Sequence, residues 1–438
     1  MKIDVARESA LKILYKIEEE NGYSNLVLDE YIEAKREKLS VKDVNFISEM
    51  VYGVVTWKLT IDTILAKHSK IKINKISKWV KMILRIGIYQ IVFLDKVPKR
   101  AAVNESVNLC KKYGYKSVNF VNAILRKVEK SDYEELSKIE NEVERISTMY
   151  SIPVWMVEKL LQEYGSQKAE EICIHSNQKP KMTIRVNTLK TTIQELKAKL
   201  EQREIQYEQA DLENFLSIKQ IKGISNLDLF QEGFFTIQDE GAGNIGYFVN
   251  PKENERVLDA CSAPGGKTTH LAELMKNKGK IEAWDLHVNR VKLVEQNAKR
   301  LGISIITTKQ KDALQYEEKY KEKFDKILLD VPCMGLGVIK RKPDIKWKKT
   351  KEDIADLVRV QKEILQICSQ YLKPGGEIVY STCSILKEEN EKVIEEFIHG
   401  KAFDIIEQKN ILPEQNTDGF FMCKLRKMLQ TNSHLEEK

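Results

Sequence analysis

Short apolar segments alternate with helix-length segments from Val257 onward, and this alternation restricts the fold more than any other feature of the chain. It is typical of βαβ units, in which crossover helices join parallel strands. The expected strands are residues 257–261, 280–284, 303–308 and 326–329, followed by a run that ends at Tyr380. We therefore predict an α/β domain with a parallel sheet over residues 251–430.

The sequence before this domain divides into two further parts. In residues 1–140, apolar positions recur at the three-to-four-residue spacing of amphipathic helices, which predicts an all-α domain. Residues 145–250 mix helical and extended patterns, which predicts a small intermediate α+β domain. Residues 431–438 are polar and are expected to form a tail.

The composition indicates a soluble globular protein. The 438 residues are 42% hydrophobic and 31% charged, with a net charge of +7. The chain has neither an apolar run of about 18 residues nor the apolar centre of a signal peptide at its start. Its seven cysteines include no C-x-x-C pair, which argues against a zinc site or a disulfide framework. We expect a cytoplasmic monomer with reduced thiols, no metal and no membrane association.

Positive charge is concentrated in residues 340–349 (KRKPDIKWKK), which carry six Lys or Arg against one Asp and include Trp347. Such a stretch is either a solvated loop or a loop that contacts nucleic-acid phosphates. Because it closely follows a predicted catalytic motif, the phosphate-contacting interpretation is favoured.

A glycine turn follows the first strand of the predicted sheet, in Cys261-Ser-Ala-Pro-Gly-Gly-Lys267. Glycines between a strand and a helix N-terminus let a ligand approach backbone amides. A P-loop is excluded because its first glycine would fall on Cys261. A dinucleotide pattern, Gly241-Ala-Gly-Asn-Ile-Gly246, lies too close to the next strand to leave room for its crossover helix. S-adenosylmethionine remains as the third candidate.

Four successive strands place a carboxylate at or just beyond their carboxyl ends, in Asp259, Asp285, Asp312 and Asp330. Asp285 suits the ribose hydroxyls of an adenosine ligand, and Asp312 could accept from the adenine amino group. One such Asp is unremarkable in a turn, whereas four around a glycine turn predict a nucleoside cofactor.

Two cysteines also follow strands, Cys333 in Asp330-Val-Pro-Cys-Met-Gly335 and Cys383 in Tyr380-Ser-Thr-Cys-Ser-Ile-Leu386. In the usual 3-2-1-4-5 strand order these two strands are neighbours about 5 Å apart, so both thiols can converge on one ligand with Asp330. The other cysteines are expected to be structural, with Cys261 packed beneath the cofactor turn and the rest buried, namely Cys110, Cys173, Cys368 and Cys423.

The combination of DVPCMG, STCS and APGGK resembles the RNA cytosine-5 methyltransferases of the Nop/Sun type. Residues 100–106 (RAAVNES) and 120–126 (FVNAILR) resemble the NusB-like RNA-binding domain, and the resemblance continues to residues 418–421. It implies a Rossmann-like S-adenosylmethionine-dependent methyltransferase domain with a mostly parallel seven-stranded sheet. RNA binding by residues 1–140 and 145–250 is also implied. The implied partner is 16S ribosomal RNA, either naked or in an early small-subunit assembly.

The resemblance also implies roles for individual residues. The predicted cofactor-binding set is Cys261, Ser262, Ala263, Pro264, Gly265, Gly266, Lys267, Asp285, Asp312 and Asp330, to which the placement of Arg290 after Asp285 adds a further candidate. Cys383 is the implied nucleophile. The chain departs from the family pattern at Val331, Met334 and Leu336, which replace the usual Ala, Ser and Thr without removing a catalytic group.

The implied chemistry requires these groups. Carbon 5 of cytosine is too weak a nucleophile to accept a methyl group unaided, and addition of a thiolate at carbon 6 activates it. Asp330 is expected to hydrogen-bond the base, and Cys333 to assist release of the enzyme. Because a stacked base is inaccessible, the target should be unpaired or flipped out. Transfer RNA is an alternative substrate, and a non-catalytic RNA-binding factor is an alternative function.

Overall fold

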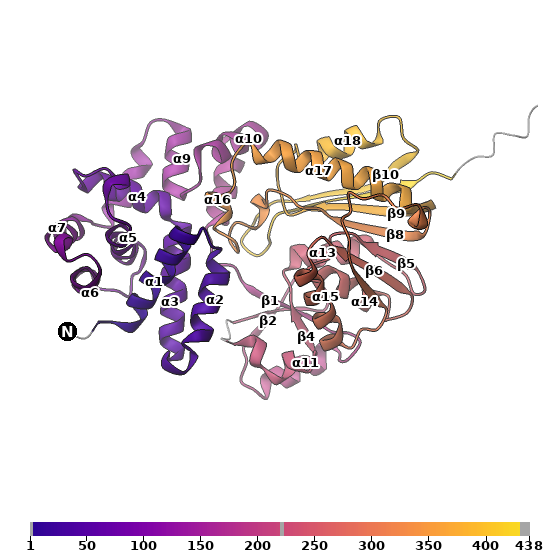
Figure 1. Cartoon of the computed structure of the whole chain (residues 1–438), viewed down its shortest axis with the longest axis horizontal. Helices are drawn as coiled ribbons and strands as arrows, with labels where there is room; N and C mark the ends of the chain where they lie inside the picture. Colours follow the sequence, from indigo (N-terminus) through magenta and orange to yellow (C-terminus); the bar gives the residue numbers. More distant parts are fainter. Residues whose placement is uncertain (1–2, 220–222, 430–438) are drawn as a thin grey trace, which may run out of the picture. The chain divides into compact units, whose positions relative to one another are not determined.

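The computed structural model describes residues 3–219 and 223–429 and divides the chain into two compact units (Figure 1). The helical unit comprises Met1–Asn177 with Ile339–Lys349, and the sheet unit comprises Gln178–Val338 with Thr350–Lys438. The predicted tail, residues 431–438, lies outside the described residues. Every helix within the two described ranges is too short or too polar to span a bilayer.

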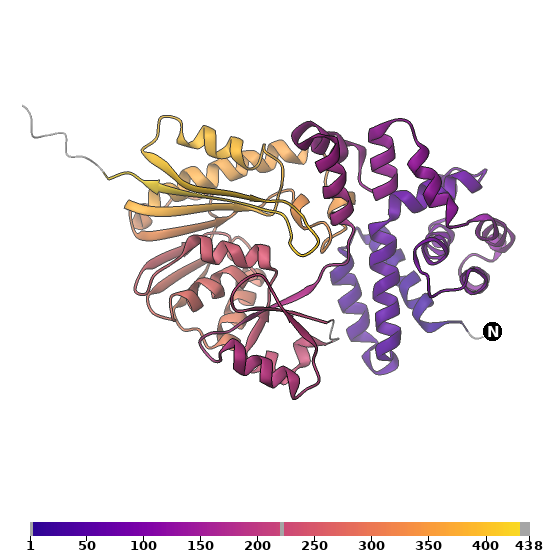
Figure 2. The same ribbon diagram turned by 180° about the vertical axis from the view of Figure 1, so that it is seen from behind.

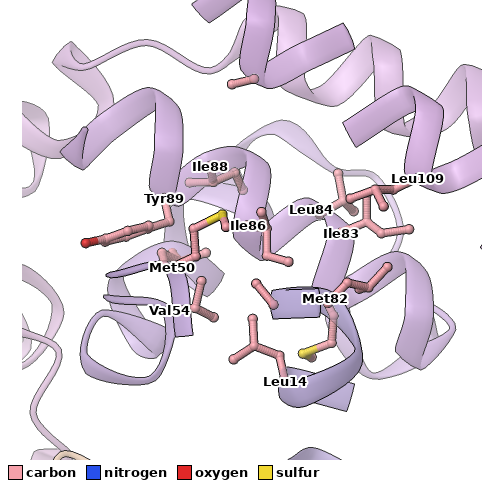
Figure 3. Close-up of a cluster of buried hydrophobic side chains, with 14 of the residues drawn as sticks. Leu14, Met50, Val54, Met82, Ile83, Leu84, Ile86, Ile88, Tyr89 and Leu109 are labelled. Carbon is pink, nitrogen blue, oxygen red and sulfur yellow. The ribbon is translucent and has the colours of Figure 1, made fainter. Parts of the chain in front are cut away.

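The helical unit is an all-α domain, as the apolar spacing predicts. Its helices are α1 Val5–Glu20, α2 Ser24–Ala34, α3 Val41–Thr56, α4 Lys58–His68, α5 Lys78–Phe93, α6 Lys99–Tyr113, α7 Val118–Lys127, α8 Ser131–Glu134, α9 Glu142–Tyr150, α10 Val154–Ser176 and α16 Ile345–Lys348. Leu14, Met50 and Ile83 come from three different helices and are buried in one core (Figure 3). Polar side chains cap the beginnings of α1 and α3: Asp4 accepts from the third backbone amide of α1, and Ser40 forms a capping box with Asp43.

A short segment from late in the sequence completes the helical unit. We call Ile339–Lys349 the docking segment. The carboxylate of Asp344 accepts from the backbone amide (3.1 Å) and the hydroxyl (2.5 Å) of Ser24 in α2. Lys346 and the indole of Trp347 each donate to a backbone carbonyl near the end of α3, at 2.7 Å in both cases.

These contacts correct the phosphate-binding interpretation of residues 340–349. Only 1% of Lys346 is exposed, and burial lowers the pKa of its ammonium group to about 7. An ammonium group enclosed in this way cannot reach a phosphate. The prediction is therefore wrong for Lys346 and Trp347, whose polar atoms are used to attach the docking segment to the helices. The sequence could not reveal that Lys346 is buried, because the pattern around a buried lysine does not differ from the pattern around a solvated one.

The first part of the sheet unit is a small antiparallel sheet with the strand order β2-β3-β1-β4. Its elements are β1 Met182–Val186, α11 Ile193–Glu201, β2 Tyr207–Gln209, β3 Phe215–Ile218, α12 Asp228–Gln231 and β4 Phe235–Ile237. Ile184, Leu196 and Phe235 are buried in a core of their own between this sheet and α11. The predicted α+β character of this region is thus confirmed.

The second part is the mostly parallel seven-stranded sheet, with the order β10-β11-β9-β8-β5-β6-β7. Its strands are β5 Arg256–Asp259, β6 Lys280–Asp285, β7 Ile306–Gln310, β8 Phe324–Asp330, β9 Leu372–Thr382, β10 Phe403–Ile411 and β11 Phe420–Lys427. Strands β5 to β9 pair in parallel, whereas β11 is antiparallel to both of its neighbours. The predicted 3-2-1-4-5 order therefore holds for β5 to β9.

Helices cover both faces of this sheet (Figures 1 and 2). They are α13 Glu240–Val249, α14 Gly266–Leu274, α15 Val288–Leu301, α17 Asp353–Cys368 and α18 Glu391–Ile398. Side chains on α17 and α18 share one core with Leu258 and Trp284, while Ala283 packs against Val294 of α15 on the opposite face. The alternation of inward-facing residues along each strand produces these two layers.

Two sequence expectations are refined. The third strand begins at Ile306, three residues later than predicted, because Ile303 belongs to the turn after α15. The rejected dinucleotide pattern lies inside α13, where its glycines allow close packing: a Cβ on Gly246 would lie 2.2 Å from Nδ1 of His270. Those glycines therefore serve helix packing.

Candidate active site

Cys333 and Cys383 meet because β8 and β9 are parallel neighbours. Asp330 at the end of β8 pairs in register with Ser381 of β9, so both chains leave the sheet at the same edge. The two sulfur atoms lie 3.1 Å apart, and each cysteine is partly exposed. The predicted convergence of the two thiols is present.

Close backbone contacts fix the loops that carry the thiols. The amide of Gly337 donates to the carbonyl of Cys383 at 2.9 Å, and the amide of Gly419 donates to the carbonyl of Gly337 at 2.8 Å. A Cβ on Gly337 would lie only 2.2 Å from the carbonyl oxygen of Gly419, so a larger residue does not fit here. Three chain segments thus converge behind the pair of thiols.

A partly buried ion pair lies beside the thiols. Nζ of Lys267 is 2.7 Å from Oδ2 of Asp330, whose other oxygen accepts from the hydroxyl of Ser381 at 3.2 Å. Burial opposes the charge of Lys267, but the Asp330 carboxylate outweighs it and raises the pKa of the ammonium group, with Cys383 contributing in the same direction. Lys267, expected to contact the cofactor or RNA, is therefore held by Asp330 in this structure.

The electrostatics differ between the two thiols. The hydrogen bond shared with Cys383, together with burial, raises the pKa of Cys333 well above its usual value, and the charges of Glu389 and Asp330 act in the same direction. These effects keep the proton on Cys333. The positive charge of Lys267 interacts with Cys383.

Two consecutive residues that sequence reasoning missed contact both loops. Oε1 of Glu389 accepts from the amide of Met334 (2.8 Å) and from Nε2 of Gln361 (2.9 Å). Oδ1 of Asn390 accepts from the hydroxyl of Thr382 at 2.6 Å. Glu389 and Asn390 lie within an acidic run, EENE, that reads as the solvated start of a helix. No signal in the sequence distinguishes them.

The glycine turn has the shape expected of a cofactor-binding turn. Gly265 has a φ of 101°, a conformation that glycine adopts readily, and α14 begins at Gly266 with its amides directed toward the turn. The Ser262 amide and hydroxyl both donate to the carbonyl of Trp284, at 2.8 and 2.9 Å. Arg290 donates to the carbonyl of Ala263 at 2.8 Å, so its predicted position near the turn is observed.

The carboxylates around this turn differ in their surroundings. Asp285 accepts from the amide of His287 at 3.0 Å and lies 3.6 Å from Arg290. Asp312 accepts from the amide of Leu314 at 2.9 Å. The amide of His287 bonds to one oxygen of Asp285, and Arg290 faces the other. Together with the α14 amides, this set of donors and acceptors fits a nucleoside cofactor.

Asp259 is an exception among the four strand-end carboxylates. It is 1% exposed and accepts from the hydroxyl of Thr268 at 2.7 Å, and burial raises its pKa to about 7. Its side chain attaches β5 to α14. Asp259 was one of the four strand-end carboxylates that predicted a nucleoside cofactor, but it was not among the predicted cofactor-binding residues. Beside it, burial raises the pKa of the Cys261 thiol, which suits the structural role predicted for that residue.

A third missed residue, Arg185, links the small sheet to the cofactor turn. Its guanidinium donates to the carbonyl of Gly266 (2.8 Å), to the Thr269 hydroxyl (3.1 Å) and to both carboxylate oxygens of Glu273 (2.8 and 2.9 Å). It also donates to Gln238. Only 1% of Arg185 is exposed. An arginine in an otherwise apolar strand was the available signal.

The remaining predicted residues are also placed. Cys110, Cys173, Cys368 and Cys423 are buried, as expected of structural cysteines. The departures from the family pattern, Val331, Met334 and Leu336, are buried beside the Cys333 loop. Among the residues that the structure describes, no three His, Cys, Asp or Glu side chains are grouped closely enough to hold a metal ion.

Comparison with known proteins defines the class. Residues 246–426 match the family model for the 16S rRNA methyltransferase RsmB/F, residues 4–130 the NusB family, and residues 152–221 the ferredoxin-like domain of RsmF/B-like methyltransferases. A Rossmann-like methyltransferase with a NusB-like helical domain is thereby defined. The probable ribosomal RNA small subunit methyltransferase B of Bacillus subtilis is 39% identical over 98% of this chain and 100% of its own length. The chain belongs to the RsmB/F family of 16S rRNA methyltransferases.

Solved structures agree with this placement. A protein designated PH0851 has a TM-score of 0.82 and 28% identity, covering 98% of this chain and 100% of its own. NSun6 from Pyrococcus horikoshii, solved with SFG, has a TM-score of 0.57 and 25% identity, covering 63% of this chain and 98% of its own. The resemblance stated from the motifs is thus confirmed at the level of family and fold.

Proposed function

We propose that this chain transfers a methyl group from S-adenosylmethionine to carbon 5 of a cytosine in 16S ribosomal RNA, through a covalent adduct of Cys383 with carbon 6. The observation that carries the proposal is the pair of sulfur atoms 3.1 Å apart beside the Asp330 carboxylate. Two thiols and a carboxylate at one sheet edge suit addition to, and elimination from, a flat electrophilic base. The cofactor supplies the methyl group.

The cofactor would be held by the turn Cys261–Lys267 and by the carboxylates of Asp285, Asp312 and Asp330. Arg290 supports the turn by its bond to Ala263. That set offers amides for a carboxylate and acceptors for ribose and adenine groups, which is the polar inventory of S-adenosylmethionine. The structure of NSun6 from Pyrococcus horikoshii, which resembles this chain, was solved with SFG.

The residues act in sequence on the base. Cys383, which interacts with the charge of Lys267, forms a bond to carbon 6 as a thiolate, and electron density moves to carbon 5. Asp330 contacts the N3 and amino edge of the base; when its carboxyl group carries a proton, it donates that proton in a hydrogen bond to N3 and stabilises the negatively charged adduct. After methylation, the carbon 5 proton passes to a base, its bonding electrons form the double bond between carbons 5 and 6, and Cys383 leaves carbon 6 as a thiolate. Cys333 faces the same cytosine and assists this release.

The helical unit and the small sheet would bind the RNA. The match of residues 4–130 to the NusB family and the net charge of +7 support this assignment. The target cytosine must be unpaired or extruded to reach the thiols. Cytoplasmic location and a monomeric state remain predictions.

The test is a denaturing gel of wild-type, Cys333→Ser, Cys383→Ser and doubly substituted proteins, each incubated with 16S RNA and S-adenosylmethionine. We expect only Cys333→Ser to trap a covalent RNA adduct, since it retains the nucleophile and lacks the releasing group. An adduct only with Cys383→Ser would reverse the two roles, and an adduct with the double variant would exclude both.

Nucleoside analysis of the RNA product completes the test by showing whether 5-methylcytidine forms. Parallel incubation with transfer RNA distinguishes the two substrate classes. Failure of S-adenosylmethionine to bind in calorimetry would favour a non-catalytic RNA-binding protein instead.

A further inference from the structure

We propose that Glu389 and Asn390 are positioning residues that hold the two reactive thiols in register, Glu389 through the Cys333 loop and Asn390 through the end of β9. This inference rests on the proposed function, because it assigns each residue to one step of that reaction. We call the two residues the clamp.

The Glu389 half of the clamp fixes the backbone on both sides of Cys333. Its carboxylate accepts from the amide of Met334, the residue after Cys333, at 2.8 Å. Nε2 of Gln361 donates to the same carboxylate oxygen and to the carbonyl of Pro332, the residue before Cys333, both at 2.9 Å. Glu389 and Gln361 are completely buried, so water does not compete for these bonds.

The Asn390 half fixes both neighbours of Cys383 in the same manner. Its Oδ1 accepts from the hydroxyl of Thr382 at 2.6 Å, and its Nδ2 donates to the carbonyl of Ser384 at 3.0 Å. The Thr382 hydroxyl also accepts a hydrogen bond from the amide of Ser384 at 3.2 Å, and this bond closes the turn around Cys383. Asn390, Thr382 and Ser384 are fully buried.

One peptide bond joins the two halves, and a further contact fixes it to the sheet. The buried hydroxyl of Tyr380 in β9 donates to the carbonyl of Glu389 at 2.6 Å. The clamp is therefore anchored to β9, the strand that leads to Cys383, and this anchor fixes the distance between the two thiols. A preorganised spacing matters because a displacement of about 1 Å can cost on the order of 10²-fold in rate.

The carboxylate of Glu389 has an electrostatic effect in addition to its hydrogen bonds. Burying a carboxylate is costly, and a neutral amide could accept the same two hydrogen bonds. The negative charge of Glu389 acts on Cys333 and opposes a thiolate there. Glu389 thus both sets the position of Cys333 and helps to leave the thiolate at Cys383, while Asn390 is neutral and positions Cys383 alone.

The experiment follows formation and decay of the covalent adduct in single-turnover reactions of the full chain with 16S RNA and S-adenosylmethionine. Glu389→Ala should slow adduct decay by about 10²-fold and change its formation little, so that the adduct accumulates as with Cys333→Ser. Asn390→Ala should slow formation by a similar factor and change decay little. Equal effects of both substitutions on both steps would overturn the proposal.

Milder variants guard against loss of folding. Gln361→Met tests the Glu389 half, and Thr382→Val removes the hydroxyl that donates to Asn390. Gln361→Met should slow adduct decay less than Glu389→Ala does, and Thr382→Val should slow adduct formation less than Asn390→Ala does. Glu389→Gln should restore normal decay while moving the pH profile of adduct formation. An unmoved profile would refute the electrostatic part, and failure of Glu389→Gln to restore decay would refute the positioning part.

Asn187→Ala provides a matched control. Asn187 is another fully buried amide, which donates to the carbonyls of Gly233 and Leu301 in a part of the sheet unit remote in sequence from both thiols. Asn187→Ala should change the rates of both steps by no more than about twofold, because it removes three hydrogen bonds without touching either loop. If Cys333→Ser itself traps no adduct, the proposed function fails. If it traps one and the clamp variants do not separate the two steps, the clamp alone fails.

Discussion

Replacement of Arg185 by Met should destabilise the sheet unit more than most single substitutions. The substitution leaves the Glu273 carboxylate, 5% exposed, without its guanidinium partner. Breaking a buried ion pair from one side costs about 3–5 kcal/mol. For a unit of this size, 1 kcal/mol corresponds to a shift of roughly 2–4 °C in the unfolding temperature, so the expected decrease is roughly 6–20 °C.

Protonation of Glu273 gives this prediction a pH signature. Burial already raises the pKa of Glu273 in the wild type, against the opposing influence of Arg185. Without Arg185 the folded state should hold that proton more tightly still. The proton's contribution to stability is lost as pH rises through the folded pKa, so the defect of Arg185→Met should be smaller at pH 5 than at pH 8.

Calorimetry is the appropriate assay, because it resolves the transitions of separate units in a protein that need not unfold in one step. The matched control is Arg185→Met combined with Glu273→Leu, which removes both charges and should recover most of the lost stability. A loss below about 1 kcal/mol for Arg185→Met, or no recovery in the double variant, would refute the argument. Since Arg185 also bonds to Gly266, the single variant should bind S-adenosylmethionine several-fold more weakly.

Three further predictions concern other parts of the molecule. Burial raises the pKa of Asp259 to about 7, so the stability contributed by its proton should be lost as pH rises from about 4 to 7. In urea denaturation, Asp259→Asn should flatten this pH dependence of stability, and an unchanged profile would contradict the prediction. Burial lowers the pKa of Lys346 to about 7, so the helical unit should gain thermal stability as pH rises from about 7 to 9. Lys346→Met should abolish this gain, and a gain that persists in the variant would show that another group causes it. Gly337→Ala should slow adduct formation by at least about tenfold at unchanged cofactor affinity, because its Cβ would meet the Gly419 carbonyl at 2.2 Å; a normal rate would show that the loops can separate without consequence.

The sequence predicted those parts of the molecule that depend on local pattern. Alternating strands and helices predicted the parallel sheet, and the strand-end motifs placed Cys333, Cys383 and Asp330 at one edge, because adjacent parallel strands end at the same edge. Residues that act through tertiary contacts were missed. Arg185 contacts residues more than 80 positions away, and Gln361 contacts Glu389 across 28 positions.

Charge was the least predictable property. Lys346 lies in a run of cations that suggested phosphate binding, yet its ammonium group is buried against carbonyl oxygens. Asp259 lies in a series with Asp285 and Asp312 but is enclosed beneath the turn. Residue type and spacing do not specify which side of a strand or loop faces solvent once the loop departs from regular structure.

The docking segment also has a consequence for how the protein is made. A ribosome releases Met1–Asn177 about 170 residues before it completes Ile339–Lys349. At roughly 5–20 residues per second, the helices emerge roughly 9–34 s before completion of the segment that supplies the partners of Ser24 and α3. During that interval the helical unit is unfinished, and its final contacts form only after the loop bearing Cys333 has been synthesised. Completion of the amino-terminal half is therefore a late event in the synthesis of the chain.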